Sequence, residues 1–175
     1  MLRERRPHVV VTYDPDGGYR HPDHVQAHRV TVRAVELAAP EWRVPRLLWV
    51  QVPLGDALDE REQVREAAAS AMLPEPLLPG PDADGWPPAV ADDDAFAVVV
   101  DAPTHLTAKS DALAAHATQV RVAPPWYALS NGEARLLTAR EGYVLGAGEP
   151  VPDAPASDLF AGLAVDDDED PPTTP

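Results

Sequence analysis

The sequence predicts an α/β fold with a parallel sheet, because strand-like apolar runs alternate with helix-like segments. Two runs rich in β-branched and aromatic residues, His8–Tyr13 and Arg46–Val52, are typical of buried parallel strands. Between them, Pro22 fits the first position of a helix, where its missing N–H costs nothing. We expect this helix to run from about Pro22 to Ala39 and the first strand to be central in the sheet.

Further elements follow along the chain. A helix is expected over Leu58–Met72, and an irregular loop over the proline-rich segment Leu73–Pro88. Thr104 is the expected N-cap of another helix that runs to about Val120. The remaining apolar runs predict three strands, namely Ala95–Asp101, Tyr127–Leu129 and Gly142–Leu145.

Composition limits the classes of function. The 175 residues carry a formal net charge of −15, which argues against a nucleic-acid surface. Without cysteine, any metal site must use nitrogen and oxygen ligands. No apolar run approaches membrane-spanning length, so we expect a soluble cytoplasmic protein. Residues 1–163 are expected to form the folded domain, and the acidic tail at 164–175 to be disordered.

The segment from Gly17 to His24 is the candidate site, since it lies between the first strand and the first helix. His21 and His24 share one helical surface, and Asp23 sits where the helix dipole favours a carboxylate. One imidazole could serve as a metal ligand, and the second could act as a general acid or base. The carboxylate ligand is left open between Asp14, Asp16 and Asp23.

Two neighbouring side chains are interpreted differently. His28 shares the apolar helix face with Val25 and Val32, so we expect a packed, hydrogen-bonded histidine and not a ligand. Tyr19, beside the two glycines, is expected to be a mobile residue that lines a pocket.

Residues 8–24, reading HVVVTYDPDGGYRHPDH, resemble the second motif of the LmbE-like (PIG-L) zinc N-acetylglucosaminyl deacetylases. Shorter runs follow the family's order almost to the C-terminus, at 112–120, 128–131, 143–145 and 158–163. The YDPDGG version is most similar to the branch acting on 1D-myo-inositol 2-acetamido-2-deoxy-α-D-glucopyranoside in mycothiol biosynthesis. The sister mycothiol S-conjugate amidases share the HPDH segment.

The resemblance implies a Rossmann-like fold, Zn²⁺ as cofactor and a small-molecule N-acetylglucosaminyl-inositol substrate. It implies that His24 is a zinc ligand and that His21 assists the tetrahedral intermediate or protonates the leaving amine. It also implies that Asp23 orients His21, that Tyr19 contacts the reacting carbonyl, and that Gln119 approaches the substrate.

The family's first motif, Ala-His-Pro-Asp-Asp-Glu, carries the other two zinc ligands and the general base, and it does not occur in this sequence. We therefore expect the C-terminal portion of a deacetylase, which needs a missing N-terminal segment and is inactive alone. Two alternatives remain open. One is a non-catalytic remnant, or a subunit completed by a separate polypeptide. The other is a small metalloprotein that uses His21, His24 and an acidic residue.

Overall fold

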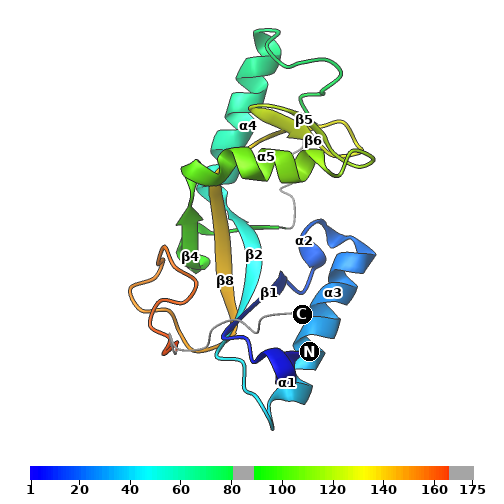
Figure 1. The fold of residues 1–175 in the computed structure, drawn as a ribbon. Helices are drawn as coiled ribbons and strands as arrows, with labels where there is room; N and C mark the ends of the chain where they lie inside the picture. The colour runs from blue at the N-terminus through cyan, green and yellow to red at the C-terminus, as the bar shows by residue number, and fades with distance from the viewer. Residues whose placement is uncertain (81–88, 166–175) are drawn as a thin grey trace.

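The computed structural model describes residues 1–80 and 89–165, and it confirms the α/β class (Figure 1). The helices are α1 (Leu2–Arg5), α2 (Gly17–Arg20), α3 (Pro22–Ala38), α4 (Leu54–Ala69) and α5 (Leu106–Ala114), with 3₁₀ turns at Asp93–Ala95 and Pro103–His105. The strands are β1 (Val9–Tyr13), β2 (Arg46–Pro53), β3 (Val90–Ala91), β4 (Phe96–Asp101), β5 (Arg121–Ala123), β6 (Trp126–Ala128), β7 (Ala134–Leu136) and β8 (Arg140–Gly148).

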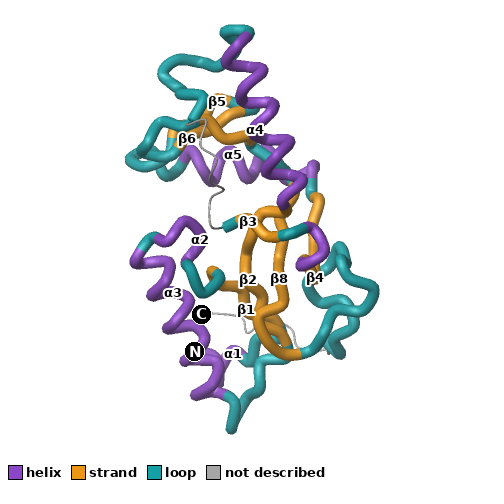
Figure 2. Tube along the Cα trace, turned by 180° about the vertical axis from the view of Figure 1, so that it is seen from behind, coloured by secondary structure: helices purple, strands orange, loops and turns teal. Residues whose placement is uncertain are grey.

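The larger sheet has the order β1-β2-β8-β4, with β3 added to β2 (Figure 2). β1 and β2 are parallel, whereas β8 is antiparallel to both β2 and β4. The sheet is therefore mixed, and the expectation of an all-parallel sheet needs correction. β8 is antiparallel because its first residue, Arg140, pairs with Asp101 at the carboxyl end of β4. From there β8 runs in the direction opposite to β4.

β1 lies at the edge of this sheet and not at its centre, because β2 is its only partner among the described residues. Val11 on β1 is 44% exposed, although its sequence environment is typical of a buried strand. At the opposite edge, β4 is covered by a bridge between Val98 and Ala156. The open edge of the sheet is thus the one that leads into the candidate site.

The described residues form two apolar cores. One core lies on the larger sheet, where Leu48, Val98 and Tyr143 are buried against Val151 in the segment that follows β8. The other joins α4 to the small antiparallel sheet β5-β6-β7 through Val64 and other buried residues, namely Ala67, Leu77, Trp126, Ala128 and Ala134.

A fully buried arginine fixes the segment after β8. Arg46 is 0% exposed, and its guanidinium donates hydrogen bonds of 2.6–3.2 Å to four backbone carbonyls. These carbonyls belong to Glu149, Pro150, Leu159 and Ala161. The arginine therefore supplies the hydrogen bonds that this irregular segment does not make with itself.

Several expected boundaries shift. The helix expected at Leu58–Met72 begins at Leu54, directly after β2. The helix expected to reach Val120 ends at Ala114, and Thr104 lies in a 3₁₀ turn without capping it. Within the expected loop 73–88, residues 81–88 lie outside the described part, as do residues 166–175 of the expected tail. Across residues 1–80 and 89–165, we find no helix with the length and apolar character needed to cross a bilayer.

Candidate active site at the carboxyl end of β1

The loop between β1 and α3 has an unusual backbone. Gly17 and Gly18 have φ values of +67° and +65°, and Arg20 has a φ of 64°. A Cβ on Gly17 would lie 2.4 Å from the backbone nitrogen of Val25, so only glycine fits against the start of α3. The two glycines therefore allow the loop to fold back tightly onto the helix that carries the histidines.

A buried carboxylate organises this loop. Asp14, which is 4% exposed, accepts a 2.7 Å hydrogen bond from the backbone N–H of Gly18 through Oδ1. Its Oδ2 accepts a 2.9 Å hydrogen bond from Nε2 of Gln51 on β2. Both oxygens are thus engaged inside the protein, and Asp14 does not fit the role of metal ligand that the sequence had left open.

His24 is held in one orientation. Its Nδ1 lies 3.2 Å from the carbonyl oxygen of Gly17, and because a carbonyl can only accept, Nδ1 must carry the proton. Its ring stacks on Tyr13 with centroids 4.0 Å apart and planes 6° from parallel. In this tautomer Nε2 has a lone pair, which is the form of imidazole that binds a metal.

Three aromatic rings meet at this point. The ring of Tyr19 lies 4.9 Å from that of His24 and 5.9 Å from that of His21, and the two imidazole centroids are 5.1 Å apart. Tyr19 is 54% exposed, as expected for a residue at the mouth of a site. The structure thus brings together the rings of His21, His24 and Tyr19, three of the side chains that the sequence places here.

His21 is the N-cap of α3, and its Nδ1 accepts a hydrogen bond of 3.2 Å from the backbone N–H of Asp23. The Asp23 carboxylate lies 3.9 Å from the same nitrogen, and its side chain is 90% exposed. Backbone capping, and not the carboxylate, therefore sets the position of His21 in this state. The expected orienting role of Asp23 remains a prediction.

His28 behaves as the sequence predicted. Its Nδ1 donates to the carbonyl oxygen of Tyr13 at 2.8 Å, and its ring packs edge-on against Trp49. It therefore supports the end of β1 and is not directed at the other two histidines.

The residues present do not form a complete zinc site. Within residues 1–80 and 89–165, no group of three or more His, Cys, Asp or Glu side chains is placed to hold a metal. His24 fits as one nitrogen ligand, whereas a catalytic zinc takes about three protein ligands. The expected small metalloprotein built on His21 and His24 therefore lacks a third ligand in the described part of the chain.

Gln119 lies in the turns after α5, and it lines a cavity of about 420 Å³ with residues that include Leu77, Arg121 and Leu129. In the described chain, the hydrogen bonds and ring contacts of the histidine cluster do not involve Gln119. Its approach to the substrate remains a prediction.

Two functional contacts escaped sequence reasoning, those of Gln51 and of the Tyr13 ring. The available signal for Gln51 is its position as a polar residue inside the apolar run of β2. Gln51 also borders a cavity of about 430 Å³ whose lining includes the ion pairs Lys109–Glu141 and Arg135–Glu60.

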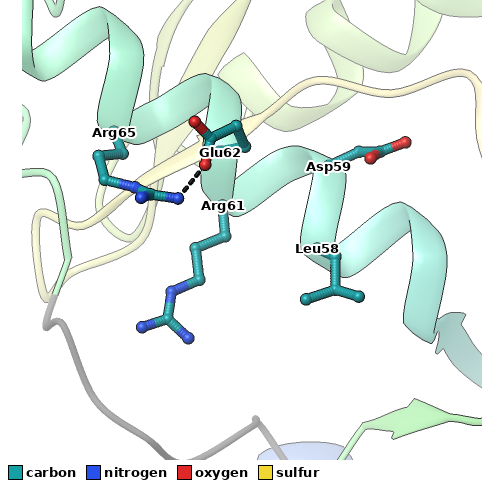
Figure 3. Close-up of a pocket in the computed structure, with 5 residues that line it drawn as sticks. All are labelled: Leu58, Asp59, Arg61, Glu62 and Arg65. Atoms are coloured by element: carbon teal, nitrogen blue, oxygen red, sulfur yellow. Dashed lines mark hydrogen bonds and ion pairs between the residues drawn. The ribbon is translucent and has the colours of Figure 1, made fainter.

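A further pocket lies on α4, away from the histidine cluster. Figure 3 shows its lining residues, which all come from that helix, and Glu62 and Arg65 pair with each other. The pocket shares no lining residue with the histidine cluster, and we assign it no role.

Curated relatives match nearly the whole chain, whereas no family model matches it. A protein of Streptomyces avermitilis named 1D-myo-inositol 2-acetamido-2-deoxy-alpha-D-glucopyranoside deacetylase is 43% identical, over 94% of this chain and 57% of its own length. Proteins of the same name from Streptomyces scabiei and Rhodococcus jostii are 42% and 45% identical, each over 93% of the chain. They are covered over 53% and 57% of their lengths, so the chain spans little more than half of these relatives.

Proposed function

We propose that this chain belongs to the family of these relatives, the LmbE-like deacetylases, and that it contributes the His21–His24 part of their active site. The observation that carries the proposal is the fixed His24 imidazole, whose Nδ1 is bound to Gly17 and whose Nε2 keeps its lone pair. It lies in the segment most similar to the family motif, and it already has the tautomer of a metal ligand.

The proposed reaction is hydrolysis of the N-acetyl group of 1D-myo-inositol 2-acetamido-2-deoxy-α-D-glucopyranoside. Water adds to the amide carbonyl carbon, the C–N bond breaks, and acetate and the protonated amine leave. A bound zinc ion would supply polarisation of the carbonyl and a lowered pKa for water.

The roles of this chain's own residues follow from their positions. We assign His24 as one metal ligand through Nε2. Nδ1 of His21 accepts a hydrogen bond from the backbone N–H of Asp23, so the ring proton is on Nε2. There it is available to the carbonyl oxygen or the leaving amine of the substrate. Tyr19 lies against both rings, and its hydroxyl is assigned to the substrate carbonyl. Asp23 and Gln119 keep the roles that the resemblance implies.

The remaining ligands and the general base are assigned to an N-terminal segment, in the same or a separate polypeptide. Two observations support this assignment. Among the described residues His24 has no co-ligands, and the edge strand β1, on which Val11 is 44% exposed, ends at Tyr13 against the His24 ring. A strand added at this edge would place new side chains next to His24.

The test is a chimera in which this chain replaces the matching region of the Streptomyces avermitilis relative. Zinc content is measured by elemental analysis, and amine release from the N-acetyl substrate by a fluorogenic amine reagent. We expect about one zinc per chain and turnover in the parent chimera. His24→Ala should lose both, whereas His105→Ala, an exposed histidine outside the cluster, should retain both.

Each other outcome has a defined meaning. Zinc and near-parental turnover in His24→Ala would remove His24 from the site. A folded chimera without turnover would favour the non-catalytic remnant. Cleavage of a mycothiol S-conjugate in preference to the N-acetyl sugar would assign the chain to the amidases.

A further inference from the structure

Asp14 is a buried carboxylate that the proposed reaction leaves without a role. It follows the last residue of β1, is 4% exposed, and accepts hydrogen bonds from uncharged groups, the Gly18 N–H and the Gln51 amide. Burying a carboxylate is costly, and hydrogen bonds to both of its oxygens offset part of that cost. One of these hydrogen bonds connects Asp14 to His24 through the backbone of Gly17 and Gly18.

A single peptide group lies between Asp14 and His24. The Gly18 N–H donates to Asp14 at 2.7 Å, and the Gly17 carbonyl accepts from Nδ1 of His24 at 3.2 Å. These N–H and C=O groups are the two ends of the same Gly17–Gly18 peptide bond. We propose that Asp14, braced by Gln51, is a positioning residue that fixes this peptide and through it the tautomer and direction of His24.

Metal-binding histidines commonly donate their second ring nitrogen directly to a carboxylate or to a backbone carbonyl. Here the carboxylate acts through the carbonyl. The negative charge of Asp14 polarises the peptide N–H, which makes the Gly17 carbonyl a stronger acceptor for the imidazole proton. The Nδ1–H form of His24 is thereby favoured, and its Nε2 becomes the better donor to a metal.

The glycines explain why such an anchor is needed. Both have positive φ, and glycine has access to more backbone conformations than other residues, so the orientation of the peptide between them needs a contact that holds it. Asp14 holds one end of it, and Gln51 holds Asp14 from the neighbouring strand β2 at 2.9 Å. The orientation of a ligand on α3 is therefore set by side chains at the ends of β1 and β2.

This inference rests on the proposed role of His24 as a ligand, but its first test needs neither metal nor activity. The isolated chain is labelled with ¹⁵N-histidine, and the two ring nitrogens of His24 are observed by NMR at about pH 8.5, above the ordinary histidine pKa. His24→Gln identifies the signals. We expect the wild-type ring to be in the Nδ1–H form.

Asp14→Ala should shift His24 toward the Nε2–H form that free imidazole side chains prefer. Gln51→Leu should give a smaller shift in the same direction, because Asp14 stays but loses its brace. The matched control is Asp93→Ala, since Asp93 also accepts a hydrogen bond from a glycine N–H, that of Gly55 at 3.0 Å, on another part of the molecule. It should leave His24 unchanged.

Should Asp14→Ala fail to fold, Asp14→Asn keeps one acceptor oxygen and removes the charge, and the same shift is expected. A wild-type ring found in the Nε2–H form, or an Nδ1–H ring retained in folded Asp14 variants, would overturn the proposal. In the chimera, Asp14→Asn should weaken zinc binding by about 10- to 100-fold with KM unchanged. An inactive chimera would count against the proposed function, while the NMR result would stand separately.

Discussion

The phenol ring of Tyr13 lies flat against the imidazole of His24, with centroids 4.0 Å apart and planes 6° from parallel. The backbone of Tyr13 is itself fixed, because its carbonyl oxygen accepts a 2.8 Å hydrogen bond from Nδ1 of His28. The last residue of β1 therefore forms a fixed base for the proposed ligand, and α3 supports that base one helical turn after His24.

This stack predicts how Tyr13 variants bind metal. Tyr13→Leu in the chimera should weaken zinc binding by roughly threefold to tenfold, since an aromatic pair contributes about 0.5–1.5 kcal/mol. Tyr13→Phe keeps the ring and should bind as the parent does. Metal competition with a chromogenic chelator measures both, and equal losses in the two variants would assign the effect to the hydroxyl.

Gly17→Ala should disrupt the start of α3. A Cβ there would approach the Val25 nitrogen to 2.4 Å, and φ is +67°. We expect unfolding free energy to fall by about 2–4 kcal/mol, from strain combined with the clash. Gly80→Ala is the matched control, because Gly80 has a φ of +76° and no atom of residues 1–80 or 89–165 lies within 4 Å of the added Cβ. Urea denaturation compares them, and similar losses would show that strain alone matters.

Arg46→Met should destabilise the chain by more than about 3 kcal/mol. The substitution removes four hydrogen bonds that a fully buried guanidinium donates to part-buried carbonyls, and a hydrogen bond to a charged group contributes about 1.5–3 kcal/mol. Arg33→Met, which removes an exposed pair with Glu36, should cost less than about 1 kcal/mol. The comparison uses denaturation midpoints. A small loss for Arg46→Met would mean that the segment after β8 is held by its apolar contacts.

Glu141 predicts a pH dependence of stability. Burial acts to raise its pKa, but hydrogen bonds from Lys109 and Tyr143 outweigh burial, so the pKa lies below its ordinary 4.5. A depressed folded-state pKa stabilises the protein above the unfolded value, and this contribution is lost as pH falls below about 4.5 and through the folded value.

The stability advantage of wild type over Glu141→Gln should therefore be full at neutral pH and shrink below about pH 4.5. Urea denaturation across this range measures it. Glu66→Gln, an exposed carboxyl on α4, is the control and should show a smaller pH-dependent difference. A constant advantage at all pH values would contradict the role of the ionised carboxylate.

The parts of the site that depend on local sequence were predictable. Pro22 does begin α3, and His21 and His24 do meet, because one helix turn sets their spacing. Gly17 and Gly18 do form the sharp turn. His28 packs as its apolar helix face indicated. Each of these features needs only neighbours within a few residues.

Long-range partners decided the rest. The sequence leaves Asp14 open as a ligand, because the partner of its second oxygen, Gln51, lies on another strand. The edge position of β1 and the antiparallel entry of β8 depend on which strands pair, and apolar strand sequences do not specify that. Helix α5 ends at Ala114, before the predicted end at Val120, because the turns after it lead into the small sheet. The sequence predicts only one strand of that sheet.

The position of β8 has a consequence for how the protein is made. β8 pairs with both β2 and β4, so the strand that lies between them in the larger sheet follows both of them in the sequence. Until residues 140–148 emerge, β2 and β4 have no bonding partner between them, and each exposes an unpaired edge. Closing this part of the sheet therefore requires pairing between segments far apart in the sequence, a kind of contact that forms more slowly than a local hairpin.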